Sequence, residues 1–360
     1  MRRKIAFLLA LVLCLSLVCG CGNASVAETT APVETTLAPV EDDGILKILM
    51  IGHSLGNDSV YMLPYTFKNE GIENFVIGNL YHSGCRLAQH AQFAVQEALQ
   101  YAYFEFDSSR DELWQRADAA GTLTTYTGGA NDTYIKDGTI AQTIKFGVQQ
   151  HDWDIVVTQA GVFEAANAQD SSLTVNLPET LKTVLDYVLA NDIEPRTVPQ
   201  IGWNMTWTCP SDEMLNDSYR NNLYKFFANQ QDMYERIADT LKNVVEPSYN
   251  FDYVMYSGTA VQNADSSYLE SSDLYRDYIH GSDFTRMVVS YVWYCTLTGT
   301  DVKDCKFGPI DYRISVDDVT KLLKQDMVMT EDQKALLIES VTNAMANPYA
   351  VTPSQYTTAP

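Results

Sequence analysis

The chain has 360 residues with 46 acidic and 24 basic side chains, which gives a formal net charge of −22 at pH 7. A surface this acidic repels nucleic acids and anionic lipid headgroups, so we expect neither as a partner. The length suits one large α/β domain behind an N-terminal segment, because the sequence shows no internal repeat and no second boundary in composition.

Residues 1–20 are predicted to be a lipoprotein-type signal peptide. Residues 2–4 are basic, residues 5–18 form an apolar run that is short for a membrane span, and the run ends in small residues. The VCGC sequence at 18–21 resembles a bacterial lipobox, which implies cleavage before Cys21 and lipidation of its thiol. We therefore expect an extracytoplasmic protein anchored to the bacterial cell membrane only through the Cys21 lipid. An ordinary signal peptide that is cut nearby is the alternative.

The remaining chain divides by composition. Residues 21–44 are rich in Thr, Pro, Ala, Val and Glu without periodicity, so we expect a disordered tether. A single folded domain is expected over 45–348, followed by a flexible tail at 349–360.

Five short apolar runs alternate with helical patterns along the domain. Nearly continuous apolar runs are typical of strands buried on both faces of a parallel sheet. The strands are expected at 46–51, 74–81, 153–159, 197–204 and 253–256, with room for another at 101–106 in the irregular stretch 101–138. Helices are expected at 87–99, 139–150, 178–191, 217–244, 281–297, 316–324 and 331–346. This alternation predicts an α/β fold, a three-layer doubly wound sandwich with a central, mostly parallel five-stranded sheet, as in flavodoxin-like proteins.

The first strand leads into a glycine turn and a serine. Its sequence, LKILMIGHSLGND over 46–58, places Ser54 after Gly52 and His53 and before a helical pattern. This arrangement lifts a hydroxyl out of the C-terminal edge of a sheet, where open α/β sheets bind ligands. The alternative is that Ser54 only caps the helix.

Other residues suited to serine chemistry follow later strands or precede a late helix. Gly84 follows the second expected strand and Gln159 ends the third, while Asp277 and His280 stand just before the helix at 281–297. A serine needs a base within hydrogen-bond reach, and histidine suits that role at neutral pH. The base needs a carboxylate to fix its tautomer, and an Asp three residues earlier on one turn can supply it.

Together these blocks resemble the SGNH (GDSL-type) hydrolase superfamily. The closest likeness is to a bacterial lipoprotein branch of unknown function with a GNSF-like first block, and it extends over 46–299. The resemblance implies a serine esterase without a cofactor, with Ser54, Asp277 and His280 as catalytic residues. It also implies that the backbone N–H groups of Ser54 and Gly84 contribute to the oxyanion hole.

The sequence departs from the family pattern in two blocks. His53 replaces the usual Asp before the serine. The family's third conserved motif is matched literally by the sequence GAND at 129–132, which includes Asn131. This stretch follows no apolar strand, however, and the same residues are typical of a plain turn. Gln159 has the position at the sheet edge and a carboxamide that can donate to an oxyanion, so we favour Gln159 as the third donor.

The function that these features predict is an exported, lipid-anchored esterase that removes small acyl groups, such as acetyl, from carbohydrate. Its partner would be a small-molecule or glycan ester. The alternatives are a non-catalytic carbohydrate- or solute-binding lipoprotein, or a degenerate hydrolase fold used for binding.

No metal site is expected. His82, Cys85 and His90 are close together in the sequence, but no second ligand cluster completes a site. The sequence leaves open the oligomeric state and a disulfide between Cys295 and Cys305.

Overall fold

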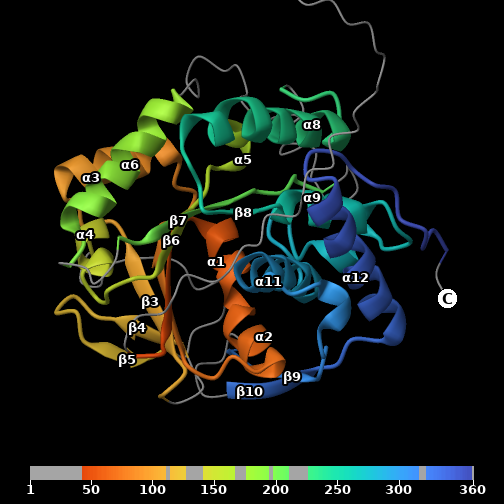
Figure 1. The fold of residues 1–360 in the computed structure, drawn as a ribbon, viewed down its shortest axis with the longest axis horizontal. Helices are drawn as coiled ribbons and strands as arrows, with labels where there is room; N and C mark the ends of the chain where they lie inside the picture. The colour runs from red at the N-terminus through yellow and green to blue at the C-terminus, as the bar shows by residue number, and fades with distance from the viewer. Residues whose placement is uncertain are drawn as a thin grey trace, which may run out of the picture. The chain divides into compact units, whose positions relative to one another are not determined.

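The computed structural model describes residues 43–110, 114–126, 141–166, 176–193, 198–210, 226–315 and 322–358, with the side chains of 310–327 outside this description. The predicted signal peptide, nearly all of the predicted tether, and both Cys21 and Asn131 lie outside these ranges. The fold is therefore that of the domain from residue 43 onward (Figure 1).

A twisted sheet forms the centre of the domain. Within the described residues it has eight strands in the order β5-β4-β3-β2-β1-β6-β7-β8. Their bounds are β1 (Leu46–Gly52), β2 (Phe75–Tyr81), β3 (Ala102–Asp107), β4 (Gln115–Ala117), β5 (Leu123–Thr125), β6 (Ile155–Thr158), β7 (Gln200–Asn204) and β8 (Tyr253–Met255). The strands β2, β1, β6, β7 and β8 are parallel to one another, whereas β3, β4 and β5 pair antiparallel.

The five parallel strands are the five that the sequence predicts, so the α/β fold with a mostly parallel sheet is confirmed. The total of five strands is too low, because β3, β4 and β5 extend one side of the sheet from the stretch 101–138. The strand expected at 101–106 is β3. Strands β4 and β5 have only three residues each, too few to give a readable period-2 pattern.

Helices cover both faces of the sheet (Figure 1). One group packs together on one face: α1 (Ser54–Tyr61), α2 (Leu63–Glu70), α9 (Ser257–Asp265), α11 (Asp283–Thr298) and α12 (Glu331–Ala346). A second group lies on the other: α3 (Leu87–Gln96), α4 (Ile144–Val148), α5 (Val162–Ala165), α6 (Leu177–Asn191) and α8 (Gln230–Thr240). Smaller elements are α10 (Ser271–Leu274), the π-helical turn η2 (Leu241–Val245), the 3-10 turns η3 (Glu246–Ser248) and η4 (Val302–Asp304), and the hairpin β9 (Ile310–Ser315) with β10 (Leu322–Met327).

Strand β1 lies at the point where the strand order reverses. The chain passes from β1 to β2 on one side and later returns to β6 on the other. Its central residues Ile48, Leu49, Met50 and Ile51 have no exposed surface, which explains their apolar run. Open α/β sheets bind ligands beyond the C-terminal ends of the strands at such a reversal. The residues that follow β1 are therefore placed at the natural ligand site of the fold.

Two predicted helices differ from the structure. In the described part of the helix expected at 217–244, α8 begins only at Gln230, because the Asn229 side chain caps it by accepting a hydrogen bond from the backbone N–H of Asp232 at 2.8 Å. The helix expected at 316–324 is wrong for residues 322–324, which belong to β10 and pair antiparallel with β9. Backbone pairing with a neighbouring strand overrides local helical preference there.

The segment expected as a flexible tail packs against the domain instead. The backbone N–H of Thr352 donates to Asn263 Oδ1 at 2.8 Å, and the N–H of Ser354 donates to Ser266 Oγ at 2.9 Å. The carbonyl of Tyr356 accepts from the N–H of Tyr268 at 2.8 Å. Residues 349–358 are thus hydrogen-bonded to α9 and to the residues that follow it.

Among the residues that the structure describes, no helix is long and apolar enough to cross a membrane. Cys85, Cys209, Cys295 and Cys305 are free thiols.

Candidate active site

Ser54 is the first residue of α1 and stands directly beyond the C-terminal end of β1. His53 caps this helix, since its Nδ1 accepts a hydrogen bond from the backbone N–H of Leu55 at 3.3 Å. Burial lowers the pKa of His53 to about 4, so the ring is neutral at pH 7 and can accept this bond. Ser54 is half-buried, and within the described residues its hydroxyl has no hydrogen-bond partner. The hydroxyl is therefore available to a ligand.

Asp277 and His280 form a hydrogen-bonded pair within one turn, between α10 and α11. His280 Nδ1 lies 2.8 Å from Asp277 Oδ2, and Asp277 Oδ1 accepts the backbone N–H groups of Ile279 at 3.0 Å and His280 at 2.9 Å. Burial alone would raise the pKa of Asp277, but the hydrogen bonds from the His280 ring and the two backbone N–H groups outweigh it and hold this pKa below its usual range. Asp277 is thus a carboxylate at neutral pH.

The turn that carries this pair is itself fixed at several points. The backbone N–H of Arg276 donates to the carbonyl of His280 at 3.0 Å, and Trp207 Nε1 donates to the carbonyl of Ile279 at 3.0 Å. Tyr275 and Gly281 form an isolated antiparallel bridge across its base. The pair is held by a closed turn rather than by a free loop.

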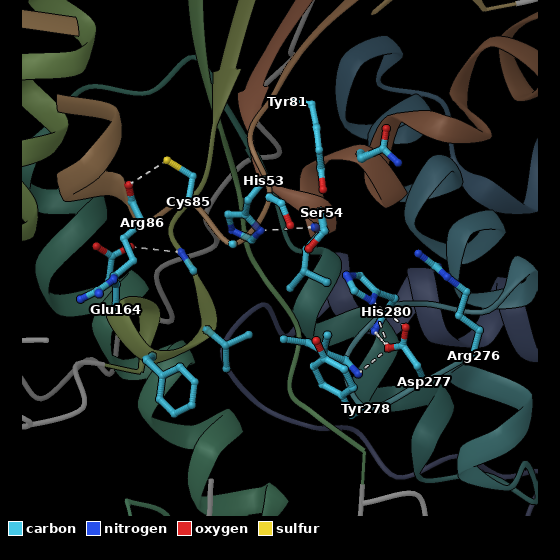
Figure 2. Close-up of a pocket in the computed structure, with 18 of the residues that line it drawn as sticks. His53, Ser54, Tyr81, Cys85, Arg86, Glu164, Arg276, Asp277, Tyr278 and His280 are labelled. Carbon is cyan, nitrogen blue, oxygen red and sulfur yellow. Dashed lines mark hydrogen bonds and ion pairs between the residues drawn. The ribbon is translucent and has the colours of Figure 1, made fainter. Parts of the chain in front are cut away.

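Ser54 and His280 line the same cavity, which has a volume of about 600 Å³. Figure 2 shows both side chains in the same part of this cavity. The wall includes residues after β1, after β2, after β6 and from the turn before α11: His53, Ser54, Leu55, Asn57, Tyr81, Ser83, Gly84, Cys85, Arg86, Gly161, Val162, Phe163, Glu164, Phe226, Arg276, Asp277, Tyr278, Ile279 and His280. Four of the predicted site residues, Ser54, Gly84, Asp277 and His280, are therefore brought together.

Gly84 lies in the turn after β2 and has the backbone conformation of a left-handed residue, with φ of +61°. A Cβ atom at this position would meet nothing within 4 Å, so the turn leaves open space there. In the part of the chain that the structure describes, the backbone N–H groups of Ser54 and Gly84 have no acceptor. Both remain available as donors to an oxyanion.

Gln159 does not line the cavity, contrary to the expectation from the sequence. Its side chain has no exposed surface and lies beneath α1, where a Cβ on Gly56 would come within 3.1 Å of Gln159 Nε2. Gln159 Oε1 accepts a hydrogen bond from Asn204 Nδ2 at 2.8 Å, and Gln159 Nε2 lies 3.2 Å from His53 Nε2. The carboxamide is committed to the protein interior and is not placed to donate into the cavity.

Aromatic side chains form part of the cavity wall. Tyr278 is 41% exposed, and its ring centroid lies 6.1 Å from that of His280. Phe163 and Phe226 are half-buried and contact each other edge to face, with centroids 6.0 Å apart. The site thus combines polar side chains with flat aromatic faces.

Glu164 is a residue of the site that the sequence reasoning missed. Its buried carboxylate accepts the backbone N–H groups of Leu87 at 2.7 Å, Ala88 at 3.3 Å and Gly161 at 3.3 Å. It therefore joins the start of α3, just after the Gly84 turn, to the segment after β6. No local pattern marks the link to α3, because Leu87 and Ala88 lie 77 and 76 residues before Glu164 in the sequence.

Asp58 is the second residue that the sequence reasoning missed. It lies four residues after Ser54 on α1 and pairs with Arg276 and Arg286. The spacing of Ser54 and Asp58 on one helix face was readable from the sequence, but the partners of Asp58 were not.

The histidines near β2 serve the packing of the domain. His90 is buried and its Nδ1 lies 2.6 Å from Tyr101 Oη, while His82 Nδ1 lies 2.6 Å from the carbonyl of Gln100. Across the described ranges, no three His, Cys, Asp or Glu side chains are grouped so that they could hold a metal ion.

Similar solved structures include a DUF4886 family protein from Bacteroides uniformis, with a TM-score of 0.59 and 21% identity over 86% of this chain and 98% of that chain. This likeness shows the fold. An acetylxylan esterase from Geobacillus stearothermophilus has a TM-score of 0.38 and 12% identity over 70% of this chain and 94% of its own. A lipase from a goat rumen metagenome has a TM-score of 0.36 and 9% identity over 70% of this chain and 98% of its own.

No curated protein matches the sequence. A family model described as "Domain of unknown function (DUF4886)" matches residues 127–324, which is more than half of the 360 residues and includes Asp277 and His280. The chain belongs to the DUF4886 family of domains of unknown function.

Proposed function

We propose that this protein is an exported serine esterase of the SGNH type. The observation that carries the proposal is the position of Ser54 and the hydrogen-bonded Asp277–His280 pair on one cavity at the C-terminal edge of the sheet. A nucleophile, a base and an orienting carboxylate in one site form the constellation of serine hydrolases, which recurs on unrelated folds. A protein that only binds its ligand has no need of all three.

In this mechanism Ser54 Oγ attacks the carbonyl carbon of a bound ester while His280 Nε2 takes the hydroxyl proton. Asp277 keeps the proton on Nδ1 and stabilises the imidazolium that forms. The backbone N–H groups of Ser54 and Gly84 donate to the oxyanion of the tetrahedral intermediate. Collapse releases the alcohol, which receives the proton from His280, and leaves the acyl group on Ser54. Water, activated by His280, then releases the acid and restores the serine.

The substrate that we propose is a small acyl ester, such as an acetyl ester, on a carbohydrate. The cavity of about 600 Å³ lies within the range of small-ligand sites, so it is large enough for a sugar unit with its ester. Phe163, Phe226 and Tyr278 line the cavity, and aromatic rings suit the apolar face of a sugar ring.

We also propose that the enzyme is lipid-anchored outside the cytoplasm. The basic residues at 2–4, the apolar run at 5–18 and the VCGC sequence ending at Cys21 support this proposal. An anchored enzyme with an open cavity can act on soluble or cell-surface glycans near the membrane.

The test compares hydrolysis of an aryl acetate and of an acetylated oligosaccharide by the wild type and by Ser54→Ala. The matched control is Ser109→Ala, because Ser109 is exposed on the turn after β3 and away from the cavity residues. The proposal expects turnover of both esters by the wild type and by Ser109→Ala, and loss of both in Ser54→Ala. Calorimetric binding of the oligosaccharide without turnover would show a binding lipoprotein instead.

A further inference from the structure

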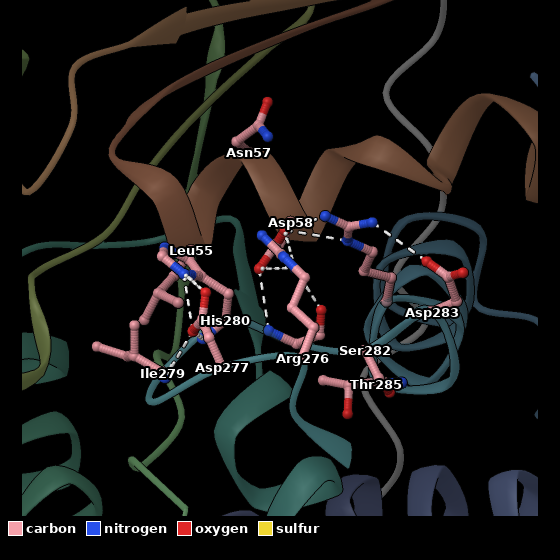
Figure 3. Close-up of polar contacts among 12 residues, drawn as sticks. Leu55, Asn57, Asp58, Arg276, Asp277, Ile279, His280, Ser282, Asp283 and Thr285 are labelled. Carbon is pink, nitrogen blue, oxygen red and sulfur yellow. Dashed lines mark hydrogen bonds and ion pairs between the residues drawn. The ribbon is translucent and has the colours of Figure 1, made fainter. Parts of the chain in front are cut away.

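A buried carboxylate links the helix of the nucleophile to the turn of the acid–base pair. Asp58 is fully buried on α1, four residues after Ser54, so both residues lie on the same face of this helix. Figure 3 shows Asp58 between this helix and the turn before α11. Taking a carboxylate out of water costs several kcal/mol unless charged partners and hydrogen bonds compensate. The groups that compensate the buried charge of Asp58 therefore indicate the role of this residue.

Those partners lie on both sides of the Asp277–His280 turn. Asp58 Oδ2 accepts hydrogen bonds from Arg276 Nη1 at 3.0 Å and from the backbone N–H of Gly281 at 3.0 Å. Arg276 directly precedes Asp277, and Gly281 directly follows His280. Arg276 Nη1 also donates to the carbonyl of Gly281 and so ties the two flanks to each other.

The other oxygen of Asp58 fixes the start of α11. Arg286 donates from Nε at 3.0 Å and from Nη2 at 2.8 Å to Asp58 Oδ1. Arg286 is 5% exposed, and its guanidinium lies over the ring of Tyr61, 4.7 Å from the centroid. Asp283 takes a third guanidinium contact at 3.2 Å. The charges of Asp58 and Asp283 thus balance those of Arg276 and Arg286.

We propose that Asp58 is a positioning residue that sets the placement of His280 relative to Ser54. Ser54 and Asp58 are one helical turn apart on a rigid element, and Asp58 holds both flanks of the turn that presents His280. A buried ion pair is weak evidence for a role in stability, because apolar residues often replace one without loss. Contacts that bracket the acid–base pair are evidence for positioning. This inference rests on the proposed serine-esterase function.

The first test is kinetic. Asp58→Asn keeps the shape of the side chain but removes its charge, and it should lower kcat for an aryl acetate by about 10²-fold with KM nearly unchanged, because a displacement of about 1 Å has an effect of this size. In a His280→Ala background the same substitution should lower kcat by less than about threefold, since Asp58 acts through His280.

Glu105→Gln is the matched control for the loss of a buried carboxylate. Glu105 is 1% exposed and pairs with Arg110 and His151, and none of these three residues lines the cavity. Its substitution should leave kcat within about threefold of the wild type even if it lowers the melting temperature. Arg276→Lys is a milder variant of the same link, because it keeps the charge but loses the guanidinium Nη1 that donates to both Asp58 and Gly281. It should lower kcat by about tenfold, again only when His280 is present.

The second test does not depend on activity. Hydrogen–deuterium exchange should become faster in the segment 275–283 of Asp58→Asn and Arg276→Lys, and should be unchanged there in Glu105→Gln. If the double variant lost kcat by the product of the losses in Asp58→Asn and His280→Ala, the two residues would act independently and the proposal would be overturned. Unchanged hydrogen–deuterium exchange in the segment 275–283 would also overturn it. If Ser54→Ala kept wild-type turnover, the proposed function would fail, and the exchange rates alone would still decide whether Asp58 holds the turn.

Discussion

The imidazole of His280 has Nδ1 at 2.8 Å from Oδ2 and at 3.0 Å from Oδ1 of Asp277. An ionised carboxylate can only accept hydrogen bonds, so Nδ1 carries a proton, and in the neutral form of the ring the lone pair is on Nε2. This tautomer is the one that a general base for a serine requires. The pair therefore fixes the orientation of the His280 ring in the cavity before any ligand binds.

Replacement of Asp277 by Asn should lower kcat for an aryl acetate by about 10⁴-fold, because the amide can stabilise the wrong tautomer of His280 and carries no charge for the imidazolium. His280→Ala removes the base itself and should cost about 10⁶-fold. Steady-state kinetics on purified variants with wild-type melting temperatures measure both. Equal rates in Asp277→Asn and the wild type would contradict the role of the pair.

The placement of this pair illustrates what the sequence can predict. Ser54 and Gly84 follow the strands β1 and β2, whose apolar runs and glycine turns are local signals. Asp277 and His280 are three residues apart, so one turn can join them. The five parallel strands were predictable for the same reason, since each is a buried run with its own boundaries.

The features that the sequence could not predict depend on distant partners. Arg276 and Arg286 follow Asp58 by 218 and 228 residues, and nothing near Asp58 indicates which cations it meets. The last residues look like a tail by composition, but their backbone N–H groups donate to side chains on α9 and at its C-terminal end. Gln159 has the expected position in the chain, yet its side chain turns inward, where its Oε1 accepts a hydrogen bond from the buried Asn204 Nδ2.

The buried position of Gln159 leads to a prediction about stability. Gln159→Ala removes the acceptor of Asn204 Nδ2 and should lower the free energy of unfolding by about 1–3 kcal/mol, with kcat reduced less than tenfold. Urea unfolding and steady-state kinetics on the same samples separate the two effects. A loss of 10²–10³-fold in kcat at unchanged stability would instead show that Gln159 reaches the oxyanion after all.

His53 should make stability depend on pH. Burial lowers its pKa to about 4, whereas the ring in the unfolded chain titrates near 6.5. As pH falls below 6.5 the unfolded state binds a proton that the folded state does not, so stability falls with pH by about 1.4 kcal/mol per unit down to pH 4. His53→Asn retains a capping side chain but does not titrate. Between pH 7 and pH 5, the free energy of unfolding measured with urea should fall by about 2 kcal/mol less in His53→Asn than in the wild type. Identical pH dependence in both proteins would contradict this account of His53.

The lipid anchor is tested by Cys21→Ser. The wild type should incorporate a labelled fatty acid, partition into the detergent phase and accumulate as a precursor when globomycin blocks lipoprotein processing. The variant should do none of these. A Cys21→Ser protein that is cut normally and released in soluble form would point to an ordinary signal peptide.

The most direct test of the central claim is labelling with a fluorophosphonate probe, followed by mass-spectrometric mapping of the modified residue. The probe reacts with a serine that a neighbouring base activates, so the account predicts a single adduct on Ser54. His280→Ala should slow labelling by several orders of magnitude, about 10⁴-fold or more, and Ser54→Ala should abolish it. An adduct on another residue, or labelling that persists in Ser54→Ala, would contradict the assignment of Ser54 as the nucleophile.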